Sequence, residues 1–137
     1  MLKKLLVIIV VILIAIQFIP GNKTNPPVTS EINAPAEVIA VFKKSCYDCH
    51  SNETVWPWYS HIVPVSLLIE EDVNKGRSHF NFSDWGNLSR KDKSKLKEEI
   101  WEMIKKENMP LGKYILLHPE AELSSQEREI IKEWSGE

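Results

Sequence analysis

The sequence lacks several features that define whole classes of protein. With 137 residues it is too short for a large multidomain enzyme. It has only 2 cysteines, which excludes a scaffold built on several disulfides, and its 5 glycines and 8 prolines are too few for a collagen-like or disordered chain. No stretch shows the strict alternation of a half-buried strand, and there is no internal repeat. A single all-α domain is therefore expected.

An excess of positive charge is also missing. The chain has 17 Lys and Arg against 19 Asp and Glu, which gives a formal net charge of −2. No global positive field draws such a protein to nucleic acid, so nucleic-acid binding is not expected. Hydrophobic residues at 43% and charged residues at 26% match an ordinary globular chain.

One long hydrophobic run is present, at the N-terminus. Lys3 and Lys4 precede an apolar stretch, Leu5–Ile19, which ends at Pro20. Paired lysines before an apolar run are typical of an exported chain. The run is slightly shorter than the roughly 17 to 25 residues of a membrane-spanning helix, so a signal peptide and an anchor both fit its length.

The absence of a cleavage site favours the anchor. No small-x-small triplet follows the run, and no cysteine is available there for lipid attachment. With the lysines held inside by the positive-inside rule, we predict that residues 1–20 form a single-pass anchor in the inner (cytoplasmic) membrane. The remainder of the chain would then face the periplasm.

The remainder divides into a linker and a domain. Residues 21–34 are rich in Pro, Asn, Ser and Thr and have no periodicity, which predicts a tether. Helical periodicity begins at Pro35, in a stretch that runs into the cysteines. A second pattern opens at Pro64, with Gly76 predicted as its stop.

Two further helices are predicted in the C-terminal half. Ser89 is a candidate N-cap for an amphipathic run, and Ser124 with Glu127 forms a capping-box pattern before the terminal helix. Residues 35–137 are therefore expected to form a small bundle of about four short helices.

The two cysteines lie in one motif that carries specific chemistry. Cys46 and Cys49 are separated by two residues, and His50 follows at once, which is the C-x-x-C-H pattern of c-type haem attachment. At a helical turn, each thiol can form a thioether with one vinyl group of haem, while the histidine reaches the iron. This histidine must be neutral, so its other ring nitrogen should meet an acceptor. The motif predicts one haem c attached through Cys46 and Cys49.

Three other readings of the motif compete. A dithiol redox site normally follows a strand, and no strand pattern is present. An exported cysteine pair could form a simple disulfide. A zinc site needs four ligands at recognisable spacing, and beyond the motif only isolated histidines remain.

The second axial position of the iron could take Met, His or nothing. Met109 is the first candidate, because it lies in a loop between two predicted helices beside Pro110, which fixes the backbone. Packing is its alternative role, and Met103 is expected to pack in the core. Three histidines, His61, His79 and His118, are the imidazole candidates for this position. The remaining possibility is that the sixth position is open.

Two other residue types could lie around the cofactor. Arg77 could pair with a haem propionate, although a solvated surface arginine is the plainer reading. The five tryptophans are expected mainly in the core, with several placed to wall a large flat cofactor.

Four segments give the chain a family resemblance: KKSCYDCHSN, WPWYSHIVPVS, NMPLGKY and HPEAELSSQEREIIKEW. With them the chain resembles the bacterial haem-binding domain family, whose members are small, membrane-anchored, single-haem proteins similar to c-type cytochromes. The resemblance implies a cytochrome c-like bundle around the haem, with Cys46, Cys49 and His50 as its haem motif. The ligand role of Met109 is implied by similarity to single-haem cytochromes c.

Together these features predict a membrane-anchored electron carrier that exchanges single electrons with redox partner proteins. The cofactor-binding residues are then Cys46, Cys49, His50 and Met109, of which His50 and Met109 bind the iron, and no residue is catalytic. The alternative is a peroxidase-like haem enzyme or gas sensor with an open distal site. A thiol–disulfide oxidoreductase without haem is a third reading.

Overall fold

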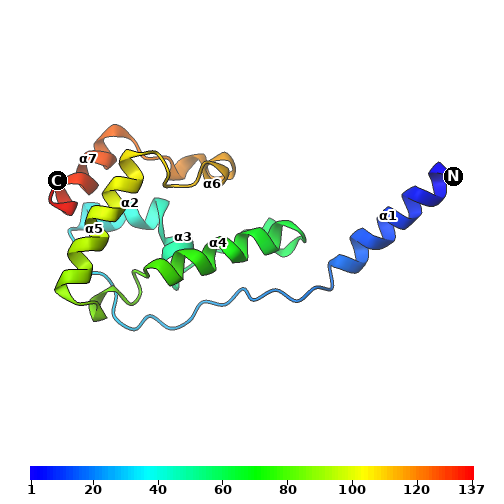
Figure 1. Cartoon of the computed structure of the whole chain (residues 1–137), viewed down its shortest axis with the longest axis horizontal. Helices are drawn as coiled ribbons and strands as arrows, with labels where there is room; N and C mark the ends of the chain where they lie inside the picture. The colour runs from blue at the N-terminus through cyan, green and yellow to red at the C-terminus, as the bar shows by residue number, and fades with distance from the viewer.

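The protein is entirely helical, as the sequence predicts, and contains no strand (Figure 1). The computed structural model describes residues 1–137. The α-helices are α1 (Leu2–Ile16), α2 (Ala36–Ser45), α3 (Tyr47–His50), α4 (Val65–His79), α5 (Arg90–Lys105), α6 (Gly112–Leu117) and α7 (Ser125–Ser135). Three 3-10 helices join them: η1 (Trp58–His61), η2 (Trp85–Asn87) and η3 (Pro119–Ala121).

Four of these helices, α2, α4, α5 and α7, are those that periodicity predicts. Both predicted caps form: the Ser89 hydroxyl accepts from the Asp92 amide at the start of α5, at 3.1 Å. At the start of α7, Ser124 and Glu127 make a complete capping box. Gly136 ends α7 in the left-handed conformation, with φ 93°.

Gly76 does not end α4, contrary to the sequence-based expectation. The helix continues to His79. At Gly76, α4 passes so close to α3 that a Cβ atom would lie 2.3 Å from the carbonyl oxygen of Cys49. Glycine is needed here because two backbones meet, and no stop signal is involved.

The core lies where α2, α5 and α7 pack together. The Phe42 and Phe82 rings, both fully buried, stack at its centre with centroids 4.6 Å apart. Phe82 comes from the segment after α4, so the core joins that segment to the bundle. The other buried members of this cluster are Ile32, Val38, Val41, Tyr47, Trp85, Ile100, Ile104, Leu123 and Ile131.

The stretch from Asn108 to Leu123, expected as a loop, contains α6 and η3. Helix α6 has six residues and none is buried, which explains why no apolar periodicity announces it. Before it, α5 ends and Glu107 takes the left-handed conformation, with φ 58°. Figure 1 shows α6 projecting from the bundle above α4.

The predicted membrane anchor is wrong. No helix of the structure is long and apolar enough to cross a membrane. Helix α1 has 15 residues and gives way to a turn at Gln17. At about 1.5 Å per residue it is shorter than a hydrocarbon core of about 30 Å. The location predicted from this anchor, in the inner membrane with the domain facing the periplasm, is therefore wrong as well.

The segment predicted as a linker, residues 21–34, lies along the domain (Figure 1). Its Asn22 amide donates to the Glu70 carboxylate of α4 at 2.8 Å. Further on, the Ile32 amide donates to the Phe82 carbonyl at 2.9 Å, and the Ile32 side chain enters the core. We call residues 21–34 the strap.

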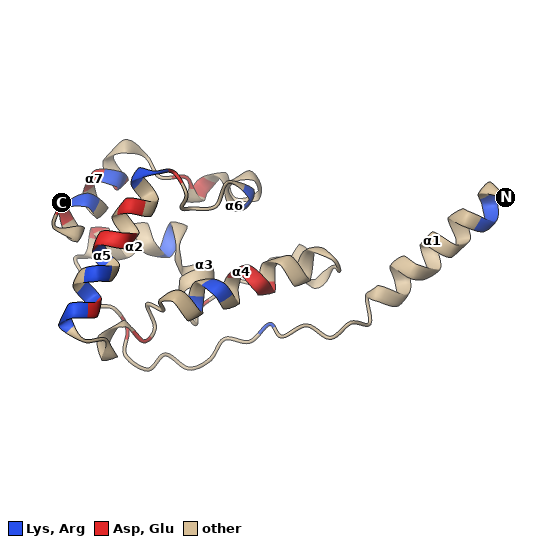
Figure 2. Cartoon of the chain, viewed as in Figure 1, with Lys and Arg blue, Asp and Glu red and all other residues tan.

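Charges of both signs are interspersed on the helices of the bundle. Figure 2 shows Lys and Arg beside Asp and Glu along α5 and α7, whereas α1 is uncharged except near its N-terminus. Several of these charges form pairs one helical turn apart, such as Lys106 with Glu102 at 2.8 Å.

Candidate cofactor site

The C-x-x-C-H motif forms a single helical turn. The Cys46 amide donates to the Phe42 carbonyl of α2 at 2.8 Å, and the His50 amide donates back to the Cys46 carbonyl at 2.9 Å. The motif therefore continues directly from α2 and closes on itself. This turn brings Cys46, Cys49 and His50 to the wall of one cavity.

The cavity measures about 690 Å³ and is mainly apolar. One wall is formed by α3, α4 and the segment after α4, and we call it the proximal wall. The other is formed by the second half of α5 and by residues 106–114, and we call it the distal wall. The apolar lining includes Phe80, Phe82, Ile100, Ile104, Leu111 and Leu123.

His50 is buried in the proximal wall and held in a fixed orientation. Its ring stacks on Phe80, with centroids 4.0 Å apart and planes 13° from parallel. Its Nδ1 lies 3.3 Å from the Phe80 carbonyl oxygen. Burial lowers the pKa of His50 to about 4, so the imidazole is neutral near pH 7.

This arrangement supplies the acceptor that the motif requires. When Nδ1 carries the proton, it donates to the Phe80 carbonyl, and the lone pair of Nε2 is free to bind a metal. Phe80 thus both orients the ring and selects the tautomer. The sequence predicts that such an acceptor exists but does not identify it.

Both cysteines are free thiols in the structure. Burial raises the pKa of Cys46 to about 12. Burial, with Asp48 and Asp72 nearby, raises the pKa of Cys49 to about 11. A dithiol oxidoreductase needs a thiol of lowered pKa to supply thiolate, so these values argue against that reading.

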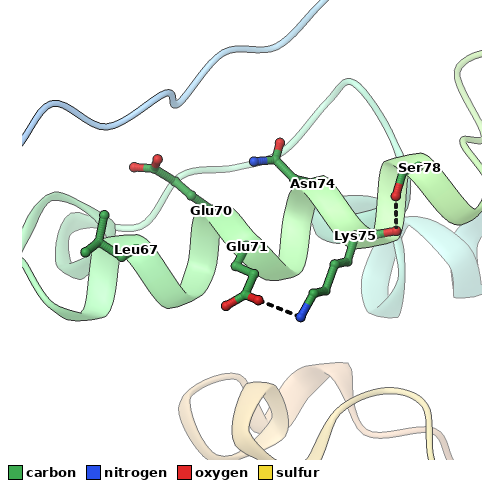
Figure 3. Close-up of a pocket in the computed structure, with 6 residues that line it drawn as sticks. All are labelled: Leu67, Glu70, Glu71, Asn74, Lys75 and Ser78. Atoms are coloured by element: carbon green, nitrogen blue, oxygen red, sulfur yellow. Dashed lines mark hydrogen bonds and ion pairs between the residues drawn. The ribbon is translucent and has the colours of Figure 1, made fainter.

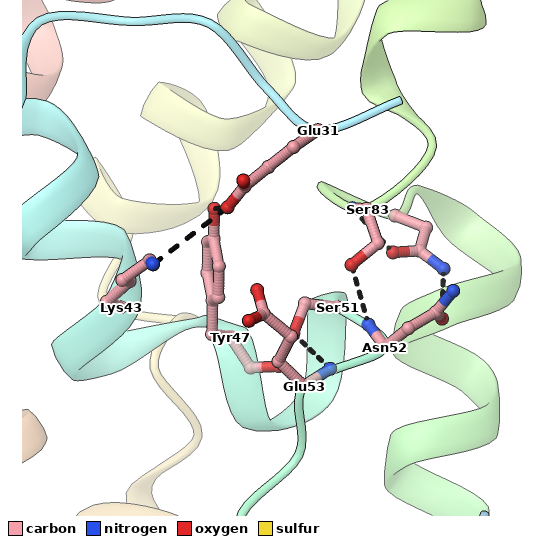
Figure 4. A network of polar contacts seen from close by, with 8 residues as sticks. Glu31, Lys43, Tyr47, Ser51, Asn52, Glu53 and Ser83 are labelled. Atoms are coloured by element: carbon pink, nitrogen blue, oxygen red, sulfur yellow. Dashed lines mark hydrogen bonds and ion pairs between the residues drawn. The ribbon is translucent and has the colours of Figure 1, made fainter. Parts of the chain in front are cut away.

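A polar network fixes the residues that follow the turn (Figure 4). The Ser51 hydroxyl donates to the Tyr47 carbonyl at 2.7 Å, and the Asn52 amide donates to the Ser83 hydroxyl at 2.9 Å. The Phe82 amide donates to the His50 carbonyl at 2.8 Å. The turn is thereby joined to the segment that carries Phe80.

Arg77 holds the same region from the other side. Its guanidinium donates to the Ser51 carbonyl at 2.7 Å and to the Thr54 hydroxyl at 2.7 Å. It also reaches the strap, at the Thr24 carbonyl (2.8 Å) and the Asn25 side chain (2.9 Å). Because its guanidinium makes these four contacts, Arg77 is not a free surface residue. Because it does not line the cavity, it is not placed to pair with a haem propionate.

Two methionines line the cavity from the distal wall, Met103 and Met109. Met109 is half-buried and follows the end of α5. Met103 is 38% exposed, so it is not the core residue that the sequence suggests. The cavity therefore receives both a neutral imidazole and thioether sulfurs.

The chain as a whole matches one known protein family. A family model described as a haem-binding domain matches residues 11–137. The chain belongs to the haem-binding domain family. No curated protein and no solved structure matches it.

The residues present fit the cofactor that gives the haem-binding domain its name. Haem is large and mostly apolar, and its iron accepts imidazole nitrogen and thioether sulfur. The apolar cavity, the neutral His50 and the adjacent thiols of Cys46 and Cys49 meet these needs. By contrast, no group of three or more His, Cys, Asp or Glu side chains is placed to hold a metal ion directly.

The other histidines of the haem-binding domain differ in their access to the cavity. His118 has both ring nitrogens engaged, Nδ1 with Glu120 at 3.0 Å and Nε2 with the Tyr59 hydroxyl. His61 is exposed and does not line the cavity. His79 does line it, with Nε2 3.4 Å from Glu99. Of the three imidazole alternatives to Met109, His79 alone faces the cavity.

The tryptophans do not wall the cavity of the haem-binding domain. None of the five lines it. Trp85 and Trp134 instead pack in the core, with ring centroids 6.0 Å apart, and Trp58 is 75% exposed. Phenylalanine and aliphatic side chains take the role that the sequence suggested for tryptophan.

A second hollow, of about 560 Å³, lies on the outer face of α4 (Figure 3). It is open, and its only apolar side chain is Leu67. The Lys75 ammonium and the Glu71 carboxylate on this face pair at 2.6 Å. The hollow has no Cys, His or Met, so it offers nothing to a haem.

Sequence reasoning missed three groups at the site. Gly76 and Phe80 support the motif from α4 and from the residue after it, and no sequence spacing connects them to the cysteines. Tyr114 of α6 donates to the Asp48 carboxylate, inside the motif, at 2.7 Å. Its position four residues after Pro110 is the one signal that could have drawn attention to it.

Proposed function

We propose that this haem-binding domain holds one haem covalently and works as a one-electron carrier between redox partner proteins. Thioether bonds from Cys46 and Cys49 would retain the haem, and His50 and Met109 would bind the iron. The observation that carries the proposal is the motif turn opening onto an apolar cavity that Met109 also lines. When bound, haem supplies reversible one-electron chemistry at its iron.

The protein's own residues position and tune that group. His50 offers a neutral nitrogen, and Phe80 fixes its direction through the carbonyl contact and the ring stack. The apolar lining from α5 and the segment after α4 keeps water away from the cofactor. Low local polarity disfavours the more highly charged oxidised iron, which raises the reduction potential.

The distal wall decides between a carrier and a catalyst. If Met109 occupies the sixth position, no site remains for a substrate, and electron transfer is the function that fits. If that position is vacant, His79 on the same cavity supplies a polar group for a peroxidase-like enzyme or a gas sensor. We propose that Met109 occupies the sixth position.

The test uses the full chain produced together with the c-type haem-attachment machinery. Covalent haem should survive acid–acetone extraction of the parent and should be lost in the double variant Cys46→Ala/Cys49→Ala. The oxidised parent should show the weak sulfur-to-iron band at the red end of the spectrum. Met109→Ala should remove this band and Met103→Ala, the matched control from the same wall, should keep it.

Each alternative predicts a different spectrum. A high-spin haem that Met109→Ala leaves unchanged would contradict the carrier proposal and favour the enzyme or the sensor, which peroxide turnover and CO binding then separate. A band lost in Met103→Ala instead would transfer the ligand role to Met103. A colourless protein with titratable thiols would contradict haem attachment altogether.

A further inference from the structure

Helix α6 is held to the rest of the molecule by very few contacts. None of its residues is buried. Two side chains of α6 nevertheless reach the proximal wall. The Tyr114 hydroxyl donates to Asp48 at 2.7 Å, and the Lys113 ammonium pairs with Asp72 of α4 at 2.7 Å.

Asp48 is a rigid acceptor for this contact. Its other carboxylate oxygen accepts from the Val55 amide at 2.9 Å, and its backbone carbonyl accepts from the Thr54 hydroxyl at 2.7 Å. It also lies between Cys46 and Cys49, so any group bound to it is placed relative to the haem-attachment turn.

The Tyr114 ring makes a second contact besides its hydrogen bond to Asp48. It stacks on His118, with centroids 4.6 Å apart and planes 24° from parallel. His118 in turn contacts Tyr59 and Glu120. Tyr114 therefore links the end of α6 to the motif turn.

We propose that Tyr114 is a positioning residue for the sixth coordination position of the haem iron. Its hydrogen bond to Asp48 ties the segment that carries Met109 to the turn that carries His50, and the Lys113–Asp72 pair adds a weaker tie. The inference rests on the proposed haem function and deepens it. Met109 lies five positions before Tyr114 and outside any helix. The distance between its sulfur and an iron bound by His50 would therefore depend on how closely the Tyr114–Asp48 hydrogen bond holds the two walls together.

The experiment measures how easily an external ligand displaces the sixth ligand. We would titrate the oxidised, haem-loaded full chain with imidazole and the reduced form with CO. In Tyr114→Phe the apparent affinity for imidazole should rise about tenfold, because a hydrogen bond to a charged group is lost. The red-end sulfur-to-iron band should weaken, while covalent haem and ligation by His50 persist.

The matched control is Tyr47→Phe. Tyr47 also donates to a carboxylate, Glu31 at 3.2 Å, but it does not line the cavity, and its partner lies on the strap. Its removal should leave imidazole affinity unchanged, even where thermal stability falls. Lys113→Gln, a change at an exposed side chain, should raise the affinity about twofold, since surface ion pairs contribute little.

Three results would overturn the inference. Tyr114→Phe could bind imidazole as the parent does, or Tyr47→Phe could raise the affinity equally, which would indicate general loosening. The haem-loaded parent could also bind CO at once as a five-coordinate protein, which would contradict the proposed carrier function as well, because Met109 would then not bind the iron. A parent without covalent haem contradicts the proposed function from the start, whereas an unchanged imidazole affinity in Tyr114→Phe, with the red-end band of the parent present, contradicts the inference alone.

Discussion

The two walls of the cavity are built in different ways. The proximal wall is backbone-rich and buried: His50 is 8% exposed, Phe82 is fully buried, and their main chains are hydrogen-bonded. The distal wall has two parts: α5 is anchored in the core by Ile100 and Ile104, whereas the segment after it leads into a six-residue helix with no buried residue, held by side-chain contacts. The proximal wall is thus fixed by the fold, while α6 at the end of the distal wall depends on a few removable contacts.

This difference assigns separate tasks to the walls. A fixed proximal ligand needs a rigid support, because on the proposed function covalent attachment and ligation would both occur within one turn. A distal ligand that arrives from a lightly held segment can be exchanged or tuned without disturbing the core. Substitutions in the proximal wall should therefore reduce stability and haem loading together, while those at the exposed side chains of α6 should act on the iron alone.

The largest expected effect is at Phe82. Phe82→Ala should lower the free energy of unfolding by about 3 to 5 kcal/mol, since it empties the centre of the core. Leu116→Ala on α6, where the side chain is 80% exposed, should change it by less than about 0.5 kcal/mol. Chemical denaturation of both variants checks the contrast, and equal losses would remove the distinction between the buried core beside the proximal wall and the lightly held α6.

Arg77→Ala should follow, with a loss of about 2 to 3 kcal/mol, because it removes a charged donor from the buried Ser51 carbonyl and from the buried Thr54 hydroxyl. Arg77→Lys keeps the charge but not the planar fork, and we expect it to recover less than half of the loss. Denaturant melts of the three proteins give the comparison. A lysine variant as stable as the parent would show that charge alone holds the strap.

At Gly76 the cost comes from added bulk. Gly76→Ala should destabilise the protein by about 1 to 3 kcal/mol and reduce haem loading, because the new methyl group meets the Cys49 carbonyl. Gly112→Ala is the control, since nothing lies within 4 Å of a Cβ there. It should be neutral or slightly stabilising. Haem content per protein and the unfolding midpoint are the readouts, and equal effects at both glycines would contradict the close approach.

The smallest effect is expected far from the cavity. Ser124→Ala removes one half of the capping box on α7 and should cost about 1 kcal/mol. The haem spectrum and the imidazole affinity should not change, because α7 contributes no residue to the cavity wall. A shifted spectrum would mean that stability anywhere in the bundle is transmitted to the iron.

Local patterns in the sequence predicted much of the fold. The caps of α5 and α7 are short-range features, so a few neighbouring residues suffice to identify them. Helix α6 escaped because it has six residues and none is buried, which leaves no periodic apolar face. Gly76 was misread because a close approach and a helix stop use the same residue. The anchor was wrong because hydropathy and flanking lysines do not measure the length of the helix that forms.

The C-x-x-C-H motif could be recognised from the sequence alone, because Cys46, Cys49 and His50 lie within one helical turn and need no distant partner to be identified. Only the tertiary structure decided what surrounds them. It brought Phe80 to His50, Tyr114 to Asp48, and Met103, Met109 and His79 to one cavity, while keeping the tryptophans and Arg77 away from it. These contacts join residues far apart in the chain, and their pairing depends on how the helices pack.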